Sequence, residues 1–354
     1  MTIPIGQLIA NRYEILAALA PGGQSDVYRV RDHHEDAVGV LKLLNLAILP
    51  GAVWSEAQIL RQLDDDHILQ IRNADVYAGQ PFIVTALAEH ETLETALAAT
   101  GGVGLEVDQV VTWMRQASMG IARAHDASLI HNDIKPGNLF LTANDECLVG
   151  DFGLASVAPP PPLIGVARGA TPETAAPEVS AAWPTRAPPA TLTTDVYSLG
   201  ATAYWLLAGR AAVDLTGVTG IPARMAAASS QTPLRLRDLA PHVPTSVASI
   251  IERAMAQSPN HRYPTMAEFA AALGSRSTKS RRWRRTNEHA GHLGCWRGER
   301  PARSTFILCL EQATAKQCTV TTRHEHGARV ANGSRTCSVK RAAQAVRATI
   351  DGLS

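Results

Sequence analysis

Residues 131–140 read HNDIKPGNLF, and the spacing of their polar side chains decides how the rest of the chain is interpreted. Asp133 supplies a carboxylate that can orient a hydroxyl group and accept its proton. Lys135 supplies a cation for developing phosphate charge, and Asn138 offers a carboxamide oxygen suited to a hard metal ion. This combination is typical of phosphoryl transfer from a nucleotide, in which the protein positions phosphates, metal ions and the attacking group.

A second carboxylate, Asp151, follows in VGDFGLA after a short apolar run. A pair of strands between the two motifs would bring Asn138 and Asp151 together at one metal ion. Upstream, Lys42 lies in the apolar run AVGVLKLL, where a lone ammonium group would be costly. Glu56, on the next predicted helix, is its natural partner. Taken alone, this pair would fit a structural ion pair equally well.

The chain changes character near Glu89. From Arg12 to about Ala86 it is rich in short strands, and RYEILAAL and DVYRVRD flank the turn APGGQS as a predicted hairpin. Amphipathic helices follow, two of them beginning with Pro-Thr pairs whose threonine can cap the first turn, while TTDVYSLGATAYWLLAG is apolar nearly all round and is predicted to be buried. The patterns predict an α+β protein with a β-rich lobe at 12–86 and a larger helical lobe at 89–274.

In motif content and order, residues 12–274 resemble a eukaryotic-type serine/threonine protein kinase, of the kind also found in bacteria. The resemblance implies the bilobal protein-kinase fold and ATP-dependent transfer of the γ-phosphate to Ser or Thr of protein substrates. The matching features, in order, are APGGQSDV for the glycine-rich loop, VLK with Lys42, Glu56, HNDIKPGN, DFG at 151–153, APE at 176–178, DVYSLG at 195–200, and Arg262, which matches the arginine that pairs with the APE glutamate, Glu178.

The resemblance also implies a role for each matching position. Asp133 would be the catalytic base, Lys135 would neutralise the γ-phosphate, and Thr171 would link the substrate-binding loop to the base. Asn138 and Asp151 would hold Mg²⁺ or Mn²⁺. Lys42, held by Glu56, would contact the α- and β-phosphates of ATP, and the remainder of the implied nucleotide site comprises Leu19, Ala20, Gly22, Gly23, Val27, Thr85 as gatekeeper, Ala86 and Ala88.

Two regions depart from the family pattern. Asn132 stands where the family has an arginine that pairs with a phosphorylated activation loop, and an asparagine cannot make that ion pair. We therefore expect a kinase that is not switched by phosphorylation of this loop. Ala20, Pro21 and Ser25 alter the glycine-rich loop, while Gly22 and Gly23 still allow backbone N–H groups to approach phosphate.

Two other functions remain open from the sequence. A pseudokinase, which binds nucleotide or partners without turnover, is compatible with the departures at Ala20, Pro21 and Asn132, although all four essential polar groups are present. A small-molecule phosphotransferase of the aminoglycoside type also has Asp and Asn five residues apart. Lys135, the APE motif and Arg262 favour a protein substrate instead.

The C-terminal end differs in composition from the rest of the chain. Residues 275–354 hold 16 Lys and Arg against 5 Asp and Glu, whereas residues 1–274 hold 17 against 27. We expect 275–354 to be a mostly disordered basic tail, suited at most to contact with anionic surfaces, and we predict no specific nucleic-acid partner. The chain contains no apolar run long enough for a membrane span and no evident leader, so a cytoplasmic location is expected.

Four of the five cysteines lie in this basic end, at 295, 309, 318 and 337. With His324 and His326 they suggest zinc, but the cysteine spacings match no usual pattern of paired ligands. The sequence therefore favours an idle tail over a metal site. Cys147 alone belongs to the kinase-like region, which is consequently not a disulfide scaffold.

Overall fold

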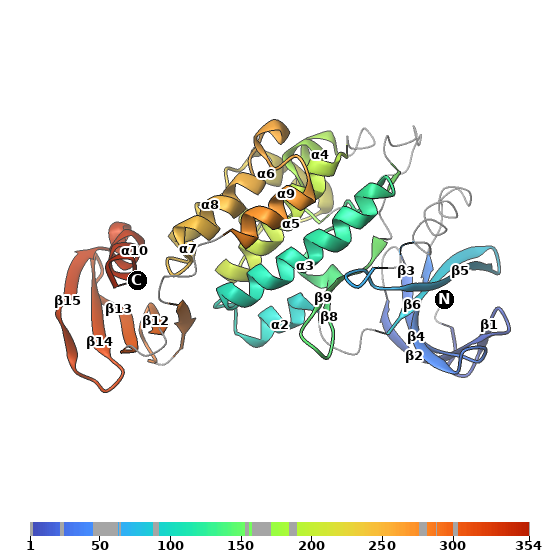
Figure 1. The fold of residues 1–354 in the computed structure, drawn as a ribbon, viewed down its shortest axis with the longest axis horizontal. Coiled ribbons are helices and arrows are strands. Elements are labelled where there is room, and N and C mark those ends of the chain that lie inside the picture. The colour runs from blue at the N-terminus through green and yellow to red at the C-terminus, as the bar shows by residue number, and fades with distance from the viewer. Residues whose placement is uncertain are drawn as a thin grey trace.

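Three parts of the chain lie in a row in the computed structural model (Figure 1): a β-rich lobe, a central helical lobe and a second β-sheet with one helix against it. The first two confirm the predicted α+β, bilobal arrangement. The structure describes residues 3–21, 25–44, 63, 65–87, 92–152, 156–157, 171–183, 190–275, 282–287, 289–299 and 304–353.

The N-terminal lobe is one antiparallel sheet in the order β1-β2-β3-β4-β6-β5. Alternate residues face its core, and Ile15, Val30, Leu41 and Val84 are fully buried there, as period-2 patterning requires. The predicted helix that carries Glu56 lies outside the described residues up to residue 62, and so do the turn residues 22–24; Leu63, which follows, is buried in the core of the helical lobe. The strands are β1 (Leu8–Ile9), β2 (Tyr13–Pro21), β3 (Ser25–Asp32), β4 (Ala37–Leu44), β5 (Ile71–Tyr77) and β6 (Gln80–Ala86).

The helical lobe is built around α5, which is buried along nearly its whole length as its apolar sequence predicts. Thr265 caps α9 by accepting a hydrogen bond from the Glu268 N–H at 3.2 Å, as predicted. The other Pro-Thr pair differs, because Thr245 is already inside α8 and Pro244 is the cap residue. The helices are α2 (Leu93–Ala99), α3 (Val107–Asp126), α4 (Pro177–Ala182), α5 (Leu192–Ala208), α6 (Ile221–Ser230), α7 (Leu236–Leu239), α8 (Thr245–Ala254) and α9 (Met266–Gly274).

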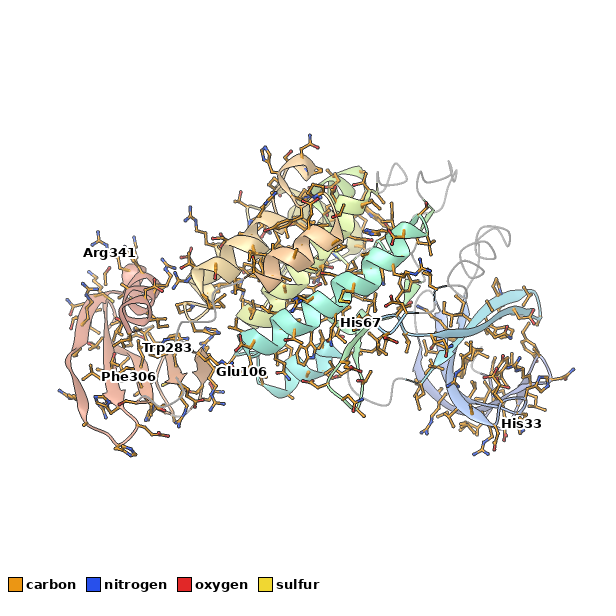
Figure 2. All side chains as sticks on the ribbon, viewed as in Figure 1. His33, His67, Glu106, Trp283, Phe306 and Arg341 are labelled. Atoms are coloured by element: carbon orange, nitrogen blue, oxygen red, sulfur yellow. The ribbon has the colours of Figure 1, made fainter. Side chains whose placement is uncertain are left out.

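The prediction of a mostly disordered tail is wrong for the described residues after 281. They form an antiparallel meander whose strands follow one another in sequence order, closed by an amphipathic helix. Trp283, Trp296, Leu308 and Val320 pack with Val346 of that helix in a separate core, and Trp283 is labelled in Figure 2. The elements are β11 (Arg282–Thr286), β12 (Gly294–Glu299), β13 (Phe306–Thr314), β14 (Gln317–His324), β15 (Arg329–Ser338) and α10 (Ala342–Leu353).

The physical reason for that error lies in how the charges are distributed. Arginine residues occupy exposed or partly exposed positions of these strands, so their charge masked the alternation that strands such as β14 show. In β14, for example, Cys318, Val320 and Thr322 face inward while their neighbours are more exposed. We name residues 282–353 the C-terminal unit.

Ion pairs join the C-terminal unit to the helical lobe. Arg237 of α7 donates to Asp351 of α10 at 2.6 Å, and Arg347 of α10 pairs in return with Asp238 of α7. Arg347 also donates to the main-chain carbonyl of Arg237 at 2.9 Å. Some of the basic side chains of the C-terminal unit therefore form ion pairs with acidic side chains of the helical lobe.

Across the described part of the chain, no helix combines the length and the apolar character needed to cross a membrane.

Candidate active site

The loop that holds the HNDIK residues is anchored by a buried carboxylate on a distant helix. Asp195, in the first turn of α5, is fully buried and accepts hydrogen bonds from the backbone N–H groups of His131 (2.8 Å) and Asn132 (3.0 Å). His125 Nε2, near the end of α3, lies 2.9 Å from the same carboxylate. These partners satisfy a group that would otherwise be costly to bury, and they fix the start of the loop to two helices.

The backbone around this anchor takes an uncommon conformation. Asn132 has φ +67°, in the left-handed region, where asparagine is tolerated better than most residues other than glycine. Its side-chain Nδ2 donates back to the Ile130 carbonyl at 3.3 Å. His131 is fully buried, with Nε2 3.0 Å from the Gly150 carbonyl. These contacts give His131 a structural place beside the loop.

Asp133 is the centre of a compact polar group. One carboxylate oxygen accepts a hydrogen bond from Thr171 Oγ1 at 2.7 Å, and the other lies 2.8 Å from Lys135 Nζ. Lys135 also donates to Thr171 Oγ1 at 3.1 Å, which closes a triangle of three side chains. Asp133 is only 7% exposed, so its carboxylate is held in one orientation with its charge balanced by a lysine.

Asn138 and Asp151 come together through a short hairpin, as predicted. The strands β8 (Leu139–Leu141) and β9 (Cys147–Val149) pair directly after Asn138, and the Gly150 N–H donates to the Asn138 carbonyl at 3.0 Å. Asn138 Nδ2 donates to the main-chain carbonyl of Asp133 at 2.7 Å, which orients its carboxamide. The carboxamide oxygen of Asn138 and the carboxylate of Asp151 are then the possible metal ligands, and this set of oxygen ligands fits Mg²⁺ or Mn²⁺.

Lys42 extends from β4 to pair with Asp151 in the structure. Burial alone would raise the pKa of the Asp151 carboxyl, but the charge of Lys42 and its hydrogen bond, with a smaller contribution from the charge of Lys135, outweigh burial, so the pKa is lowered. Asp151 therefore stays ionised and available to a cation. Glu56, the predicted partner of Lys42, lies outside the described residues.

The predicted nucleotide site is described only in part. Val27 on β3 is paired in register with Lys42 on β4, and Leu19 at the end of β2 is 52% exposed. Ala86 ends β6, and its N–H already donates to the Gln70 carbonyl at 2.9 Å. Hydrogen bonds to adenine would therefore use other backbone groups of the predicted hinge. Gly22, Gly23, Ala88 and the side chain of Ala20 lie outside what the structure describes.

The Glu178–Arg262 pair is present as predicted. Arg262 is 1% exposed and makes a bidentate contact with the Glu178 carboxylate, with both N···O distances 2.7 Å. It also donates to the main-chain carbonyl of Ala256 at 2.8 Å. Because Glu178 opens α4 a few residues after Thr171, this pair fixes the end of the segment that carries Thr171 to the helical lobe.

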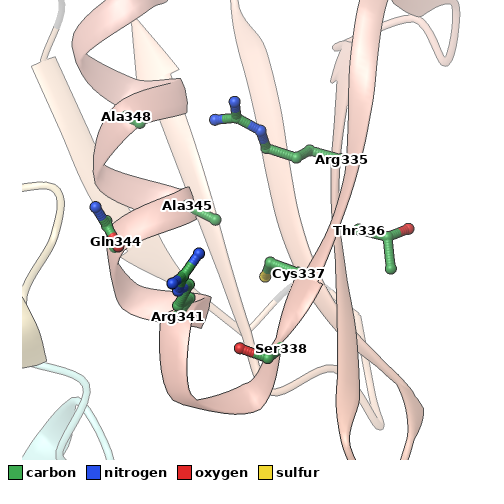
Figure 3. A pocket seen from close by; sticks show the side chains of 8 residues that line it. All are labelled: Arg335, Thr336, Cys337, Ser338, Arg341, Gln344, Ala345 and Ala348. Carbon is green, nitrogen blue, oxygen red and sulfur yellow. The ribbon is translucent and has the colours of Figure 1, made fainter.

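A pocket of about 480 Å³ lies elsewhere, between α10 and β15 of the C-terminal unit (Figure 3). Arg335 and Arg341 extend into it, and its eight lining residues include no carboxylate. It therefore offers neither a general base nor a set of metal ligands, and it is distinct from the site around Asp133.

Sequence reasoning missed the anchoring pair of Asp195 and His125. The sequence shows Asp195 only as part of the helix motif DVYSLG, and His125 stands at no ligand-like spacing that would mark it as a partner. A charged residue inside a helix that is otherwise apolar was the available signal, because such a residue must find a buried partner.

Comparisons with known proteins agree with this geometry. The protein kinase domain family matches residues 13–272. The chain is 30% identical over 280 residues to serine/threonine-protein kinase PrkC of Bacillus subtilis, covering 76% of this chain and 41% of that protein. It is 29% identical over 290 residues to PknA of Corynebacterium glutamicum, covering 76% of this chain and 57% of that protein. The chain thus spans about half the length of these relatives.

The fold also matches solved structures. The crystal structure of the Mycobacterium tuberculosis PknI kinase domain aligns with a TM-score of 0.60 at 24% identity, over 77% of this chain and 99% of that domain. The alignment leaves 23% of this chain (100% less the 77% covered) without a counterpart in that domain.

Proposed function

Because this chain belongs to the protein kinase domain family, we propose that it is an ATP-dependent serine/threonine protein kinase. Its relatives are named as serine/threonine-protein kinases, and its polar site supplies the groups that phosphoryl transfer to a hydroxyl requires. The requirement for ATP makes the cytoplasm the proposed location.

The observation that carries this proposal is the triangle of Asp133, Lys135 and Thr171. Asp133 would orient the Ser or Thr hydroxyl of the substrate and accept its proton as the hydroxyl oxygen bonds to the γ-phosphorus. The bond between that phosphorus and the β,γ-bridging oxygen breaks, and ADP leaves. Lys135 lies 2.8 Å from the Asp133 carboxylate, so it can neutralise the charge that develops on the transferred group.

Asn138 and Asp151 would hold the divalent ion, which would supply positive charge to offset the negative charge of the phosphate groups. Lys42 now pairs with Asp151, so nucleotide binding would draw Lys42 toward the α- and β-phosphates and leave the carboxylate to the ion. Every charge would stay paired, because Lys42 would exchange the Asp151 carboxylate for phosphate and Asp151 would exchange Lys42 for the metal ion.

A protein substrate is favoured over a small molecule by the surroundings of Thr171. The Glu178–Arg262 pair and the Thr171 contacts together fix the segment that, by resemblance, receives a polypeptide. Asn132 further supports activity without activation-loop phosphorylation, since an asparagine side chain carries no positive charge to pair with a phosphate group. A phosphosite map that shows stoichiometric, activating modification between residues 153 and 175 would contradict this part of the proposal.

The decisive experiment incubates the full chain with labelled ATP, Mg²⁺ or Mn²⁺ and a generic basic protein. Label should appear on Ser or Thr, and Asp133→Asn should lower the rate by about 100- to 10,000-fold, with Lys42→Met similarly impaired. Asp36→Asn, at an exposed turn carboxylate, is the matched control and should keep full activity. ATP binding without any label in the wild type would refute the kinase proposal and indicate a pseudokinase.

A further inference from the structure

We propose that the C-terminal unit binds a structural Zn²⁺ ion through His289, His292, Cys295 and Cys309. Their ligand atoms all lie within 4.8 Å of one another. The two sulfurs are 3.2 Å apart, and His289 Nδ1 lies 3.3 Å from the Cys309 sulfur and 3.5 Å from the Cys295 sulfur. His292 Nδ1 lies 3.4 Å from the Cys295 sulfur. This site is independent of the proposed phosphotransfer.

These distances are those of a nearly formed tetrahedron. Zinc bonds of about 2.3 Å to sulfur and about 2.0–2.1 Å to nitrogen place neighbouring ligand atoms about 3.4–3.8 Å apart. The three sulfur–nitrogen separations, from 3.3 to 3.5 Å, lie within a few tenths of an ångström of the tetrahedral value of about 3.5 Å. The two sulfurs, 3.2 Å apart, would move to about 3.8 Å apart when the ion binds. Two thiolates and two imidazoles form a closed ligand set that is typical of structural rather than catalytic zinc.

The sheet and one turn build the site. Cys295 on β12 and Cys309 on β13 are directly opposite in the antiparallel register, so both sulfurs leave the same face. The residues just before β12 fold back over them, with the Leu293 N–H donating to the Leu310 carbonyl at 2.9 Å. The resulting spacing, His-x2-His-x2-Cys, brings three ligands from seven consecutive residues to one point.

The surroundings also suit a bound ion. Both cysteines are buried, whereas His289 is exposed, so an ion could reach the ligands from solvent. On the far side of the His292 ring, Nε2 lies 3.9 Å from Glu311 Oε1. A carboxylate near the outer nitrogen of a ligating histidine is a common arrangement that orients the ring and increases its basicity.

A disulfide between Cys295 and Cys309 is the competing explanation. Its S–S bond would be about 2.05 Å, whereas these sulfurs are 3.2 Å apart. A disulfide would also give no reason for two imidazole nitrogens to face the sulfurs within 3.5 Å. Metal binding explains all four positions, and it would release the two thiol protons to solvent.

A bound metal ion would also stabilise the folded state of this small unit. About 70 residues depend on one modest core, and domains of that size commonly rely on a metal or disulfides. An ion here would join the turn before β12 to two central strands of the sheet. The unit should therefore lose order when the metal is removed.

The test uses the full chain, purified with reductant and without chelator, and measures metal by mass spectrometry. About one zinc per chain is expected, falling at least fivefold in Cys295→Ser and in His289→Ala. Cys337→Ser and His324→Ala are matched controls in the same unit and should retain the ion. Because a ligand variant could misfold, Co²⁺ is exchanged into the wild type, where thiolate charge-transfer and tetrahedral d–d absorption bands are expected.

Hydrogen exchange gives a second readout on the wild type. Chelation should raise exchange rates in β12 and β13 at least tenfold and leave α3 unchanged. A metal-free chain with reduced thiols that does not take up Co²⁺ would overturn the proposal. So would a Cys295–Cys309 disulfide found by peptide mapping of protein purified without oxidant, or full zinc content in the two ligand variants.

Discussion

Replacing Thr171 with alanine tests how far activity depends on holding Asp133 in place. The substitution removes the hydroxyl that donates to the Asp133 carboxylate at 2.7 Å and accepts from Lys135 Nζ at 3.1 Å. It leaves the local backbone intact, because the N–H groups of Thr174 and Ala175 bond to the main-chain carbonyl of residue 171. The expected effect is therefore a change in orientation and not a loss of folding.

The magnitude follows from the kind of bond lost. A hydrogen bond to a charged group contributes about 1.5–3 kcal/mol, and each 1.4 kcal/mol corresponds to about a factor of ten in rate. The kcat of Thr171→Ala should fall by about 10- to 150-fold, with KM for ATP changed less than about twofold. Thr171→Ser keeps the hydroxyl and should recover most of the rate.

Steady-state kinetics with varied ATP and protein substrate would measure both constants. Thr171→Ala, Lys135→Met and the double variant together form a cycle, and the two effects should be less than additive because the side chains act on one carboxylate. A kcat within twofold of wild type for Thr171→Ala would refute the reasoning. So would an equal loss in Thr171→Ser, which would indicate that the methyl group matters instead.

Two further predictions concern stability. Glu178→Gln leaves the buried Arg262 guanidinium without its carboxylate, so urea unfolding should show a loss of about 3–5 kcal/mol; a loss below 1 kcal/mol would contradict the pair's importance. Burial, with nearby Arg285 and Arg237, lowers the pKa of His242 to about 3. The unfolded chain then binds a proton below about pH 6.5 that the folded chain does not, so stability falls with decreasing pH across that window, by about 2 kcal/mol at pH 5. His242→Gln should remove this part of the pH dependence; an unchanged slope would show that other groups cause it.

The grouping of the candidate site residues could be predicted from the sequence because it is local. Asp133, Lys135 and Asn138 lie within six residues, and the pairing of β8 with β9 needs only a short turn to reach Asp151. Thr171, whose place depends on the family resemblance, also lies beside Asp133 as expected.

The anchoring of that site was not predictable, because it depends on packing between distant segments. His125 on α3, Asp195 on α5 and the loop beginning at His131 converge only once both helices are packed. Cys295 and Cys309 were likewise not predictable as neighbours, because the register of β12 and β13 brings them together and their spacing in the sequence does not. The nearby His289 and His292 were overlooked while His324 and His326 were considered.

Ion pairs also connect the acidic helical lobe to the basic C-terminal unit, and their importance depends on how much each pair contributes to stability. Arg282 and Arg284 of β11 pair with Asp108 (2.8 Å) and Glu106 (4.0 Å), respectively, at the start of α3. Glu106 is labelled in Figure 2. Exposed pairs of this kind stabilise by roughly 0–1 kcal/mol each. At Glu106 burial raises the carboxyl pKa even though Arg284 opposes it, so desolvation outweighs attraction there. These pairs therefore specify which face of the helical lobe meets the C-terminal unit more than they hold it in place.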